Sequence, residues 1–224
     1  MSRASVRVFA MMLTVLAGAV ACRAGNGATA PVPGPVANEA KTASPGKETA
    51  VVAGGCFWGI QVVFQHVKGV VSATSGYSGG SEKTADYETV SEGRTGHAES
   101  VQIVYDPSQI TYGELLRVFF SVALDPTEVN RQGPDEGMQY RSVIFYGNEE
   151  QKHIAEAYIA QLNQAKIFSR SIATQVAPLK GFYPAEAHHQ NYATLHPNDP
   201  YIVYNDAPKV ANLRREFPDL YTGK

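Results

Sequence analysis

Residues 49–67 read TAVVAGGCFWGIQVVFQHV and carry the strongest structural signal in the chain. The first part is a short apolar run that ends in two glycines, a pattern that predicts a buried strand. The second part places apolar side chains at helical spacing and predicts a helix, with an inward face of Phe57, Ile60, Val63, Phe64 and Val67. Cys56 therefore stands at a strand-to-helix junction, in the first turn of the predicted helix.

This position of Cys56 predicts a reactive thiol. Free N–H groups and the positive end of the helix dipole favour a thiolate, so we expect a lowered pKa for Cys56. Gly54 and Gly55 allow a sharp turn and leave the thiol approachable. Phe57 and Trp58 supply apolar walls beside it. The alternative is an inert cysteine buried among two core aromatics.

The N-terminal segment predicts export rather than folded structure. Two arginines precede an uncharged, mostly apolar run over residues 8–21, which is too short to span a bilayer comfortably and is typical of a signal peptide. The run ends in a small-residue cleavage pattern followed by Cys22. This ending resembles a bacterial lipoprotein signal, although Ala19 stands where leucine is usual. We expect residues 1–21 to be a signal peptide of the lipoprotein type, with the protein in the periplasm or held on a membrane by a lipid on Cys22. Ordinary secretion is the alternative.

The remaining chain predicts one domain behind a linker. Residues 22–48 are rich in Ala, Pro and Gly and lack an apolar period, so we expect a disordered tether before a domain over residues 49–224. Residues 125–141 and the tail from residue 183 fit no regular pattern, and so long a loop is usually functional. The order of the other elements predicts an α+β fold with a mixed sheet: strands within residues 69–80, 97–107, 141–147 and 171–178, and helices over residues 111–123 and 148–166.

Composition narrows the classes of function. The net charge is -2 and no basic stripe is present, so nucleic acid is not an expected partner. The two cysteines are Cys22 and Cys56; if Cys22 is lipidated, Cys56 is an unpaired thiol, which is a liability in an exported protein unless it is used. We expect no metal, because none of the histidines has zinc-site spacing: His97, His188, His189 and His196.

Five motifs together resemble the A-type peptide methionine sulfoxide reductases, in the family's order and spacing from about residue 49 to about residue 221. They are GGCFWG, GYSGG, TGHAE, NRQGPDEGMQYRS and HHQNY. The resemblance implies an α+β fold with a two-layer, ferredoxin-like core, a mixed sheet with helices, and long irregular loops. It also implies an enzyme that reduces the S epimer of methionine sulfoxide, free or in proteins, and repairs oxidised exported proteins.

The resemblance also implies roles for individual residues. Cys56 matches the nucleophile, which becomes a sulfenic acid as methionine leaves. Glu99 matches the acid that protonates the sulfoxide oxygen, and Tyr87 and Tyr140 match the tyrosines that hydrogen-bond that oxygen. Asp135 matches the aspartate of the long loop.

Four further residues match the substrate site of the family. Phe57 and Trp58 match the aromatics that hold the substrate's methyl group. His189 and Tyr192 match a segment that lines or braces the site.

Chemistry independently supports an acid role for Glu99. A sulfoxide oxygen is a weak base, and a carboxyl donates a proton at neutral pH only if its pKa is raised. A dry aromatic pocket raises it by disfavouring the charged form. We therefore expect Glu99 to be protonated in the resting protein.

The chain has no cysteine after Cys56 that could reduce a sulfenic acid. We expect no bound cofactor and an external thiol reductant, thioredoxin-like in the cell or dithiothreitol in a test tube. Cys22 is an alternative reducing thiol if it carries no lipid. We expect a monomer.

Three rival functions remain open. A cysteine hydrolase would use Cys56 as acyl nucleophile and His189 as base. A thiol peroxidase would consume peroxide without a sulfoxide. A lipoprotein without enzymatic activity would bind oxidised or apolar peptides through Phe57 and Trp58.

Overall fold

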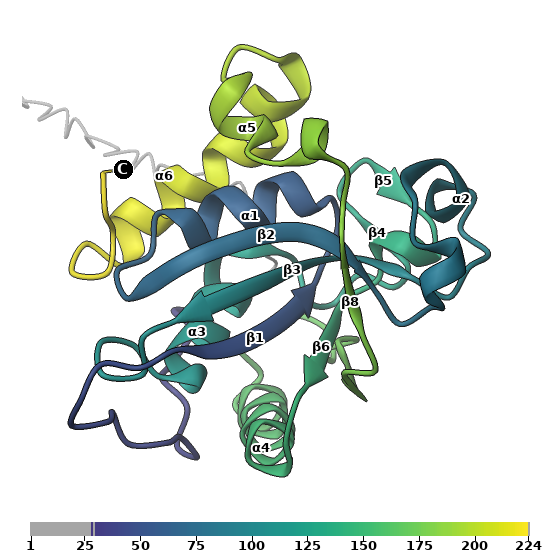
Figure 1. Ribbon diagram of the computed structural model, residues 1–224. Coiled ribbons are helices and arrows are strands. Elements are labelled where there is room, and N and C mark those ends of the chain that lie inside the picture. The colour runs from purple at the N-terminus through teal and green to yellow at the C-terminus, as the bar shows by residue number, and fades with distance from the viewer. Residues whose placement is uncertain (1–27, 29, 224) are drawn as a thin grey trace, which may run out of the picture.

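The computed structural model describes residues 28 and 30–223, which fold around a six-stranded mixed sheet (Figure 1). The strand order is β7-β6-β1-β3-β2-β8, antiparallel throughout except for the β6–β7 pair. The strands are β1 (Glu48–Ala53), β2 (Val70–Ser78), β3 (Ala98–Tyr105), β6 (Val143–Tyr146), β7 (Gln175–Pro178) and β8 (Phe182–Pro184). The expected signal peptide and the expected lipid on Cys22 lie outside the described residues.

The helices lie between the strands and after them along the chain. They are α1 (Phe57–Gln65), α2 (Tyr87–Ser91), α3 (Tyr112–Val118), α4 (Glu149–Gln164), α5 (Tyr192–Leu195) and α6 (Ala207–Glu216), with short 3-10 or π-helical turns at η1 (Glu82–Thr84), η2 (Phe119–Ala123), η3 (Met138–Tyr140), η4 (Ala187–His189) and η5 (Ile202–Asp206). In the described part of the chain, none of these helices is both long and apolar enough to cross a bilayer.

The core topology is that of a ferredoxin-like fold. Strands β1 and β2 are joined through α1, and β3 inserts between them and pairs antiparallel with both. Strand β6 then adds to the free edge of β1. The predicted α+β class with a mixed sheet is confirmed, and the predicted strands correspond to β1, β2, β3, β6 and β7.

The two faces of the sheet bear hydrophobic clusters of unequal size. Alternate residues such as Val52 and Val101 belong to a large cluster with side chains of α1, α3 and α4, whereas Val51 and Val143 belong to a small cluster on the other face. Because side chains alternate along a strand, Glu99 lies on the same face of β3 as Val101. Its carboxyl is therefore directed toward the helical layer, where α1 begins.

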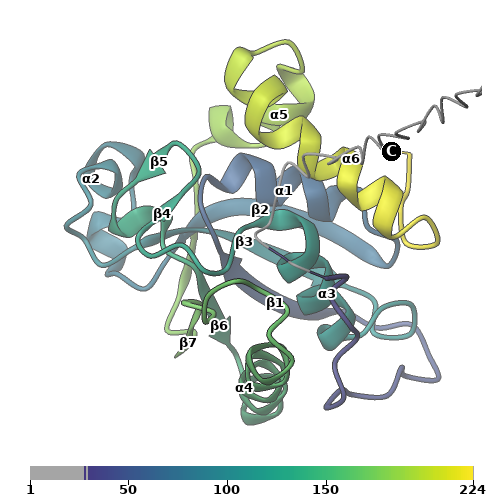
Figure 2. The same cartoon turned by 180° about the vertical axis from the view of Figure 1, so that it is seen from behind.

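The two stretches without a sequence pattern surround the start of α1, toward which the Glu99 carboxyl is directed. Residues 125–141 contain the hairpin of β4 (Arg131–Gln132) and β5 (Asp135–Glu136). The tail pairs with β2 through β8 and returns as α5 and α6, and α6 lies beside α1 (Figure 2). These segments have no apolar period because they pack through single side chains and turns.

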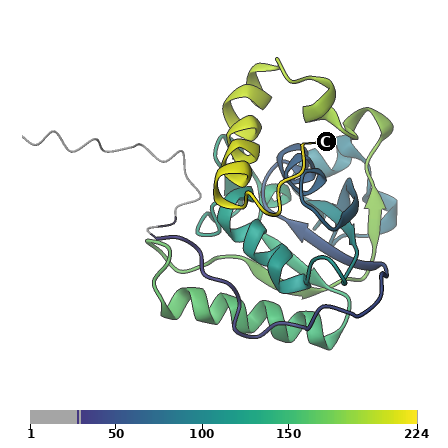
Figure 3. The ribbon, with the colours of Figure 1, turned by 90° about the vertical axis from the view of Figure 1, so that its left-hand side faces the viewer.

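The expectation of a disordered tether is wrong for residues 30–47, which we call the N-terminal strap. The strap runs along α4 (Figure 3), where the Tyr158 hydroxyl donates to the Pro33 carbonyl. Val32 is buried in the main core. The Glu39 carboxylate accepts the Tyr112 N–H at 2.6 Å, at the start of α3. Composition suggested disorder because single anchors of this kind leave no periodic pattern.

Two valines of the strap offer a matched test of this packing. Val32 is 5% exposed and Val36 is 88% exposed. We expect Val32→Ala to lower the free energy of unfolding by about 1.5 kcal/mol, since two buried methyl groups are removed. We expect Val36→Ala to change it by less than about 0.5 kcal/mol. Urea unfolding of both variants checks this, and equal effects would contradict a packed strap.

Candidate active site

Cys56 lies where β1 gives way to α1, at the residue that caps the helix N-terminus. Gly55 makes the turn with φ +92°, a left-handed conformation that other residues rarely adopt. Its N–H donates to the Tyr140 carbonyl at 3.1 Å, and a Cβ there would lie 2.6 Å from Gln132. The predicted strand-to-helix junction is confirmed, and the long loop closes directly over it.

The predicted lowering of the Cys56 pKa is wrong. Burial raises the pKa of the thiol well above its ordinary value, and the nearby carboxylates of Glu99 and Asp206 act in the same direction. The Trp58 backbone N–H at the helix start does favour the thiolate, but its effect is smaller than that of burial. The resting thiol is therefore protonated, and attack requires a local group that accepts its proton.

Glu99 is the group placed to exchange that proton. The Glu99 side chain is buried (3% exposed), and its carboxyl accepts the Phe57 N–H at 3.0 Å, so that it lies beside Cys56, with which it interacts electrostatically. Burial raises the pKa of Glu99 to about 8, against the lowering effect of the Phe57 N–H. The expectation that Glu99 is protonated at neutral pH agrees with this environment.

The raised Glu99 pKa predicts a dependence of stability on pH. Between its ordinary value of 4.5 and about 8, the folded state holds a proton that the unfolded state has lost. The free energy of unfolding therefore falls as the pH rises through that range, by a few kcal/mol in total. Glu99→Gln keeps an acceptor for Phe57 and has no proton to lose. We expect the variant to gain thermal stability relative to the native protein between pH 5 and about pH 8, and parallel pH dependences in calorimetry would contradict this.

Tyr87 and Tyr140 both lie near this pair, as expected. Burial raises the pKa of each, so both hydroxyls stay protonated and available as donors. Tyr87 begins α2, where its N–H donates to Glu186 at 2.9 Å. The other oxygen of Glu186 accepts the hydroxyl of Tyr77 at 2.9 Å. Glu186 thus fixes Tyr87 relative to β2, a role that its sequence context did not suggest.

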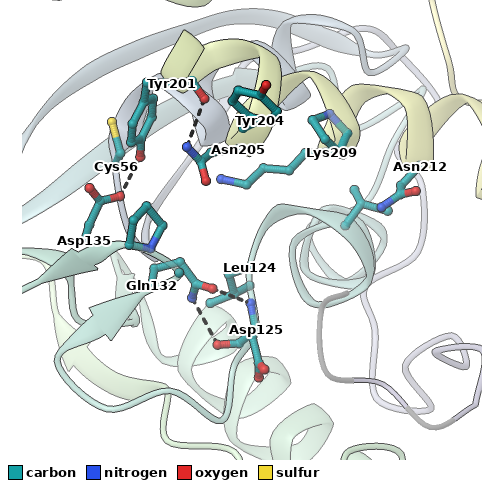
Figure 4. Close-up of a pocket in the computed structure, with 14 residues that line it drawn as sticks. Cys56, Leu124, Asp125, Gln132, Asp135, Tyr201, Tyr204, Asn205, Lys209 and Asn212 are labelled. Carbon is teal, nitrogen blue, oxygen red and sulfur yellow. Dashed lines mark hydrogen bonds between the residues drawn. The ribbon is translucent and has the colours of Figure 1, made fainter. Parts of the chain in front are cut away.

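Asp135 lines a cavity of about 190 Å³ together with Cys56 (Figure 4). Its carboxylate accepts a hydrogen bond from the Tyr201 hydroxyl, and burial raises its pKa. The loop that carries Asp135 is clamped by Arg141, which donates to the carbonyls of Gly96 and His97 at 2.8 and 2.9 Å. Arg141 thereby joins the NRQGPDEGMQYRS motif to the TGHAE motif, which lies about 40 residues earlier in the chain.

Four of the residues predicted to bind substrate form one aromatic wall: Phe57, Trp58, His189 and Tyr192. The Trp58 and Tyr192 rings stack with centroids 3.8 Å apart, and the Phe57 and His189 centroids are 5.3 Å apart. Tyr87 packs on His189 at 4.4 Å. A wall of this kind, beside a buried thiol and a protonated carboxyl, suits an apolar methyl group next to a weakly basic oxygen.

The sequence profile of the peptide methionine sulfoxide reductases matches residues 48–220. The chain belongs to this family. It is 62% identical to peptide methionine sulfoxide reductase MsrA 2 of Mesorhizobium japonicum, over 81% of this chain and 93% of that protein. It is 51% identical to MsrA 2 of Synechocystis, over 84% of this chain and 89% of the relative.

Solved structures agree with this assignment. Methionine sulfoxide reductase A of Corynebacterium diphtheriae superposes with a TM-score of 0.59 at 34% identity, over 79% of this chain and 90% of that one. Reduced Mxr1 of Saccharomyces cerevisiae superposes with a TM-score of 0.61 at 32% identity, over 72% of this chain and 91% of that one. The protein is an enzyme of the peptide methionine sulfoxide reductase class.

In this reductase His189 is poorly suited to be a base, contrary to the hydrolase alternative. Burial lowers the pKa of its imidazole, and neither ring nitrogen has a hydrogen-bond partner within the described chain. The residue contributes a neutral ring to the aromatic wall. No cluster of three His, Cys, Asp or Glu side chains suited to a metal occurs among the described residues.

The sequence motif of the reductase also contains a brace that residue-by-residue reasoning missed. The Gln190 side chain accepts the Ser75 N–H at 3.0 Å and donates to the Ser75 carbonyl at 2.9 Å. It also accepts from Gln61 of α1 at 2.9 Å. Gln190 therefore fixes the segment that carries His189 against both β2 and α1. The position of Gln190 between His189 and Tyr192, in the HHQNY motif, was the sequence feature that could have indicated this role.

Proposed function

We propose that this reductase converts the S epimer of methionine sulfoxide, free or in proteins, to methionine, with Cys56 as the nucleophile. The observation that carries the proposal is the buried Cys56 thiol at the start of α1, beside a Glu99 carboxyl that accepts the neighbouring Phe57 N–H and whose pKa is raised to about 8. A protonated acid and a sulfur nucleophile are the two groups needed to reduce a sulfoxide. The aromatic wall holds the methyl group of the substrate.

In the net reaction, methionine sulfoxide loses one oxygen and the Cys56 sulfur gains one. Glu99 gives its proton to the sulfoxide oxygen, which also accepts hydrogen bonds from Tyr87 and Tyr140. As the Cys56 sulfur attacks the sulfoxide sulfur, its proton passes to the Glu99 carboxylate, so that the thiolate exists only in the attack. This attack forms an S–S bond, and Glu99 gives the second proton as the S–O bond breaks, so that the oxygen leaves as water. A water molecule then adds its oxygen to the Cys56 sulfur as the S–S bond breaks. This step releases methionine, returns a proton to Glu99 and leaves Cys56 as a sulfenic acid.

An external thiol completes the cycle in this proposal. A thiol of the reductant attacks the sulfenic acid, forming a mixed disulfide with Cys56 and releasing water. A second thiol then breaks that disulfide and restores Cys56. A thioredoxin-like dithiol supplies both thiols, and dithiothreitol does so in vitro. The support is the cysteine count, since Cys22 and Cys56 are the two in the chain.

We also propose that the enzyme is exported, lies in the periplasm or on a membrane through a lipid on Cys22, and repairs oxidised exported proteins as a monomer. The apolar run over residues 8–21 and the cysteine that follows it support export. Mass spectrometry of the mature N-terminal peptide tests this proposal. A peptide that retains Met1 in the native host would contradict it.

The test of the activity uses the separated S and R epimers of a methionine sulfoxide peptide, with excess dithiothreitol. We expect methionine from the S epimer alone. Reduction of the R epimer at a similar rate would contradict the proposed stereochemistry. Peroxide consumption without sulfoxide turnover would favour a thiol peroxidase, and binding without turnover of either epimer would favour a peptide-binding protein.

A further inference from the structure

Gly59, the last glycine of GGCFWG, has a steric role that the reaction does not explain. It lies in the first turns of α1, and its φ is not in the left-handed region. A Cβ built on Gly59 would lie 2.1 Å from Oδ1 of Asp206 and 2.5 Å from Nζ of Lys209. Only a residue without a side chain leaves room for these two groups against the helix that Cys56 caps.

Asp206 and Lys209 form an ion pair at this place. Lys209 Nζ lies 3.1 Å from Asp206 Oδ1, and the side chains are 17% and 0% exposed respectively. The second carboxylate oxygen of Asp206 is buried without a hydrogen-bond partner in the part of the chain described. A buried pair of this kind contributes little net stability, because desolvation offsets the attraction between the charges. Its presence next to the nucleophile therefore suggests a function other than stability.

Lys209 brings this pair to the edge of the cavity that Cys56 lines. Lys209 and Cys56 both line that cavity, and the Lys209 side chain extends from α6 toward the end where Tyr201 and Cys56 lie (Figure 4). The ammonium group therefore acts on the sulfur across a small and partly enclosed space, where charges are weakly screened.

The charges around Cys56 come from several elements. The titratable groups that face it are Glu99 on β3, Asp135 on β5, Tyr87 on α2, Tyr140 on η3, Tyr201 before η5, Asp206 on η5 and Lys209 on α6. Among these groups only Lys209 carries a positive charge. It opposes burial, Glu99 and Asp206, which all disfavour a negative sulfur.

We propose that Lys209, seated by Asp206 in the space left by Gly59, is a positioning residue that stabilises negative charge on the Cys56 sulfur during its attack. The inference rests on the proposed role of Cys56 as nucleophile. Asp206 holds the ammonium group in place and also moderates its effect, because its own charge disfavours the thiolate.

Alkylation of Cys56 by iodoacetamide, followed from pH 6 to pH 10 by mass spectrometry, tests the inference without any sulfoxide. We expect Lys209→Met to slow alkylation about tenfold at pH 8, which is the change for one pKa unit. Lys209→Arg keeps the charge and should restore most of the rate. Asp206→Asn should accelerate alkylation, because it removes a negative charge while the amide oxygen of Asn can still accept the hydrogen bond from Lys209. Lys152→Met on α4, which removes a partly exposed lysine that also pairs with a carboxylate three residues away, is the matched control and should leave alkylation unchanged.

The two substitutions are expected to change the alkylation rate in opposite directions, and this difference separates an electrostatic role of the pair from a structural one. A merely structural pair predicts that Lys209→Met and Asp206→Asn change alkylation in the same direction, and that result would overturn the inference. If Lys209→Met does not fold because Asp206 is left unpaired, Asp206→Asn is compared with the double variant Asp206→Asn/Lys209→Met. The double variant should alkylate about tenfold more slowly than Asp206→Asn, and equal rates would overturn the inference.

Sulfoxide turnover of the same variants is measured separately. We expect kcat/KM for the S epimer to fall with Lys209→Met by about the same factor as alkylation, with KM unchanged. Native enzyme without turnover would refute the proposed function even if alkylation responds as expected. Native enzyme with turnover, but with alkylation indifferent to Lys209, would refute only this inference.

Discussion

Serine at position 56 should reduce the turnover of methionine sulfoxide to the uncatalysed background. The sulfenic acid requires a sulfur at this position, and a serine hydroxyl cannot accept the oxygen of the substrate. The fold should survive, because serine is close in size to cysteine and Cys56 caps a helix, a position that serine favours. The measurement is methionine release from the S epimer, by chromatography, with circular dichroism as the check on folding.

The native enzyme without reductant gives the complementary result. We expect one equivalent of methionine per enzyme molecule and then arrest, with Cys56 recovered as a sulfenic acid by mass spectrometry. Cys22→Ser is the control and should retain full turnover with dithiothreitol and the same single equivalent without it. A Cys22–Cys56 disulfide in place of the sulfenic acid, absent in Cys22→Ser, would show that Cys22 and not an external thiol reduces the sulfenic acid.

The second large effect is expected from Glu99→Gln. Removing a general acid from a buried site lowers the rate by roughly 10²- to 10⁴-fold. The native kcat/KM should be constant up to about pH 8 and fall above it, because burial raises the Glu99 pKa to about 8 and the carboxylate cannot donate. The variant has no such group, so its residual activity should lack this decline.

The shape of the pH profile is therefore the decisive readout. Rates of both proteins from pH 5.5 to pH 9.5 in one set of buffers provide it. A profile that Glu99→Gln leaves unchanged would assign the decline to another group and would contradict the acid role. The variant's predicted gain of thermal stability at the same pH values distinguishes lost chemistry from lost folding.

Local sequence determined the frame of the site. The apolar run before Gly54 and the helical spacing from Phe57 onward correctly predicted β1, α1 and the junction at Cys56. These signals are strong because strand and helix periods depend on neighbours that are close in the sequence. The motifs likewise predicted a group of residues that the structure brings together, including the ring stack of Trp58 on Tyr192.

Tertiary structure decided the charges and the supports of that site. The sequence argument from the helix N-terminus predicted a low Cys56 pKa, but burial by distant segments outweighs the helix and raises it. The strap has the composition of a disordered linker and is held by contacts to α3 and α4. The tail, which has no periodic pattern, supplies Glu186, which supports Tyr87. It also supplies Lys209, which acts on Cys56. Desolvation and long-range pairing depend on which segments meet in space, and no local pattern of residues records that.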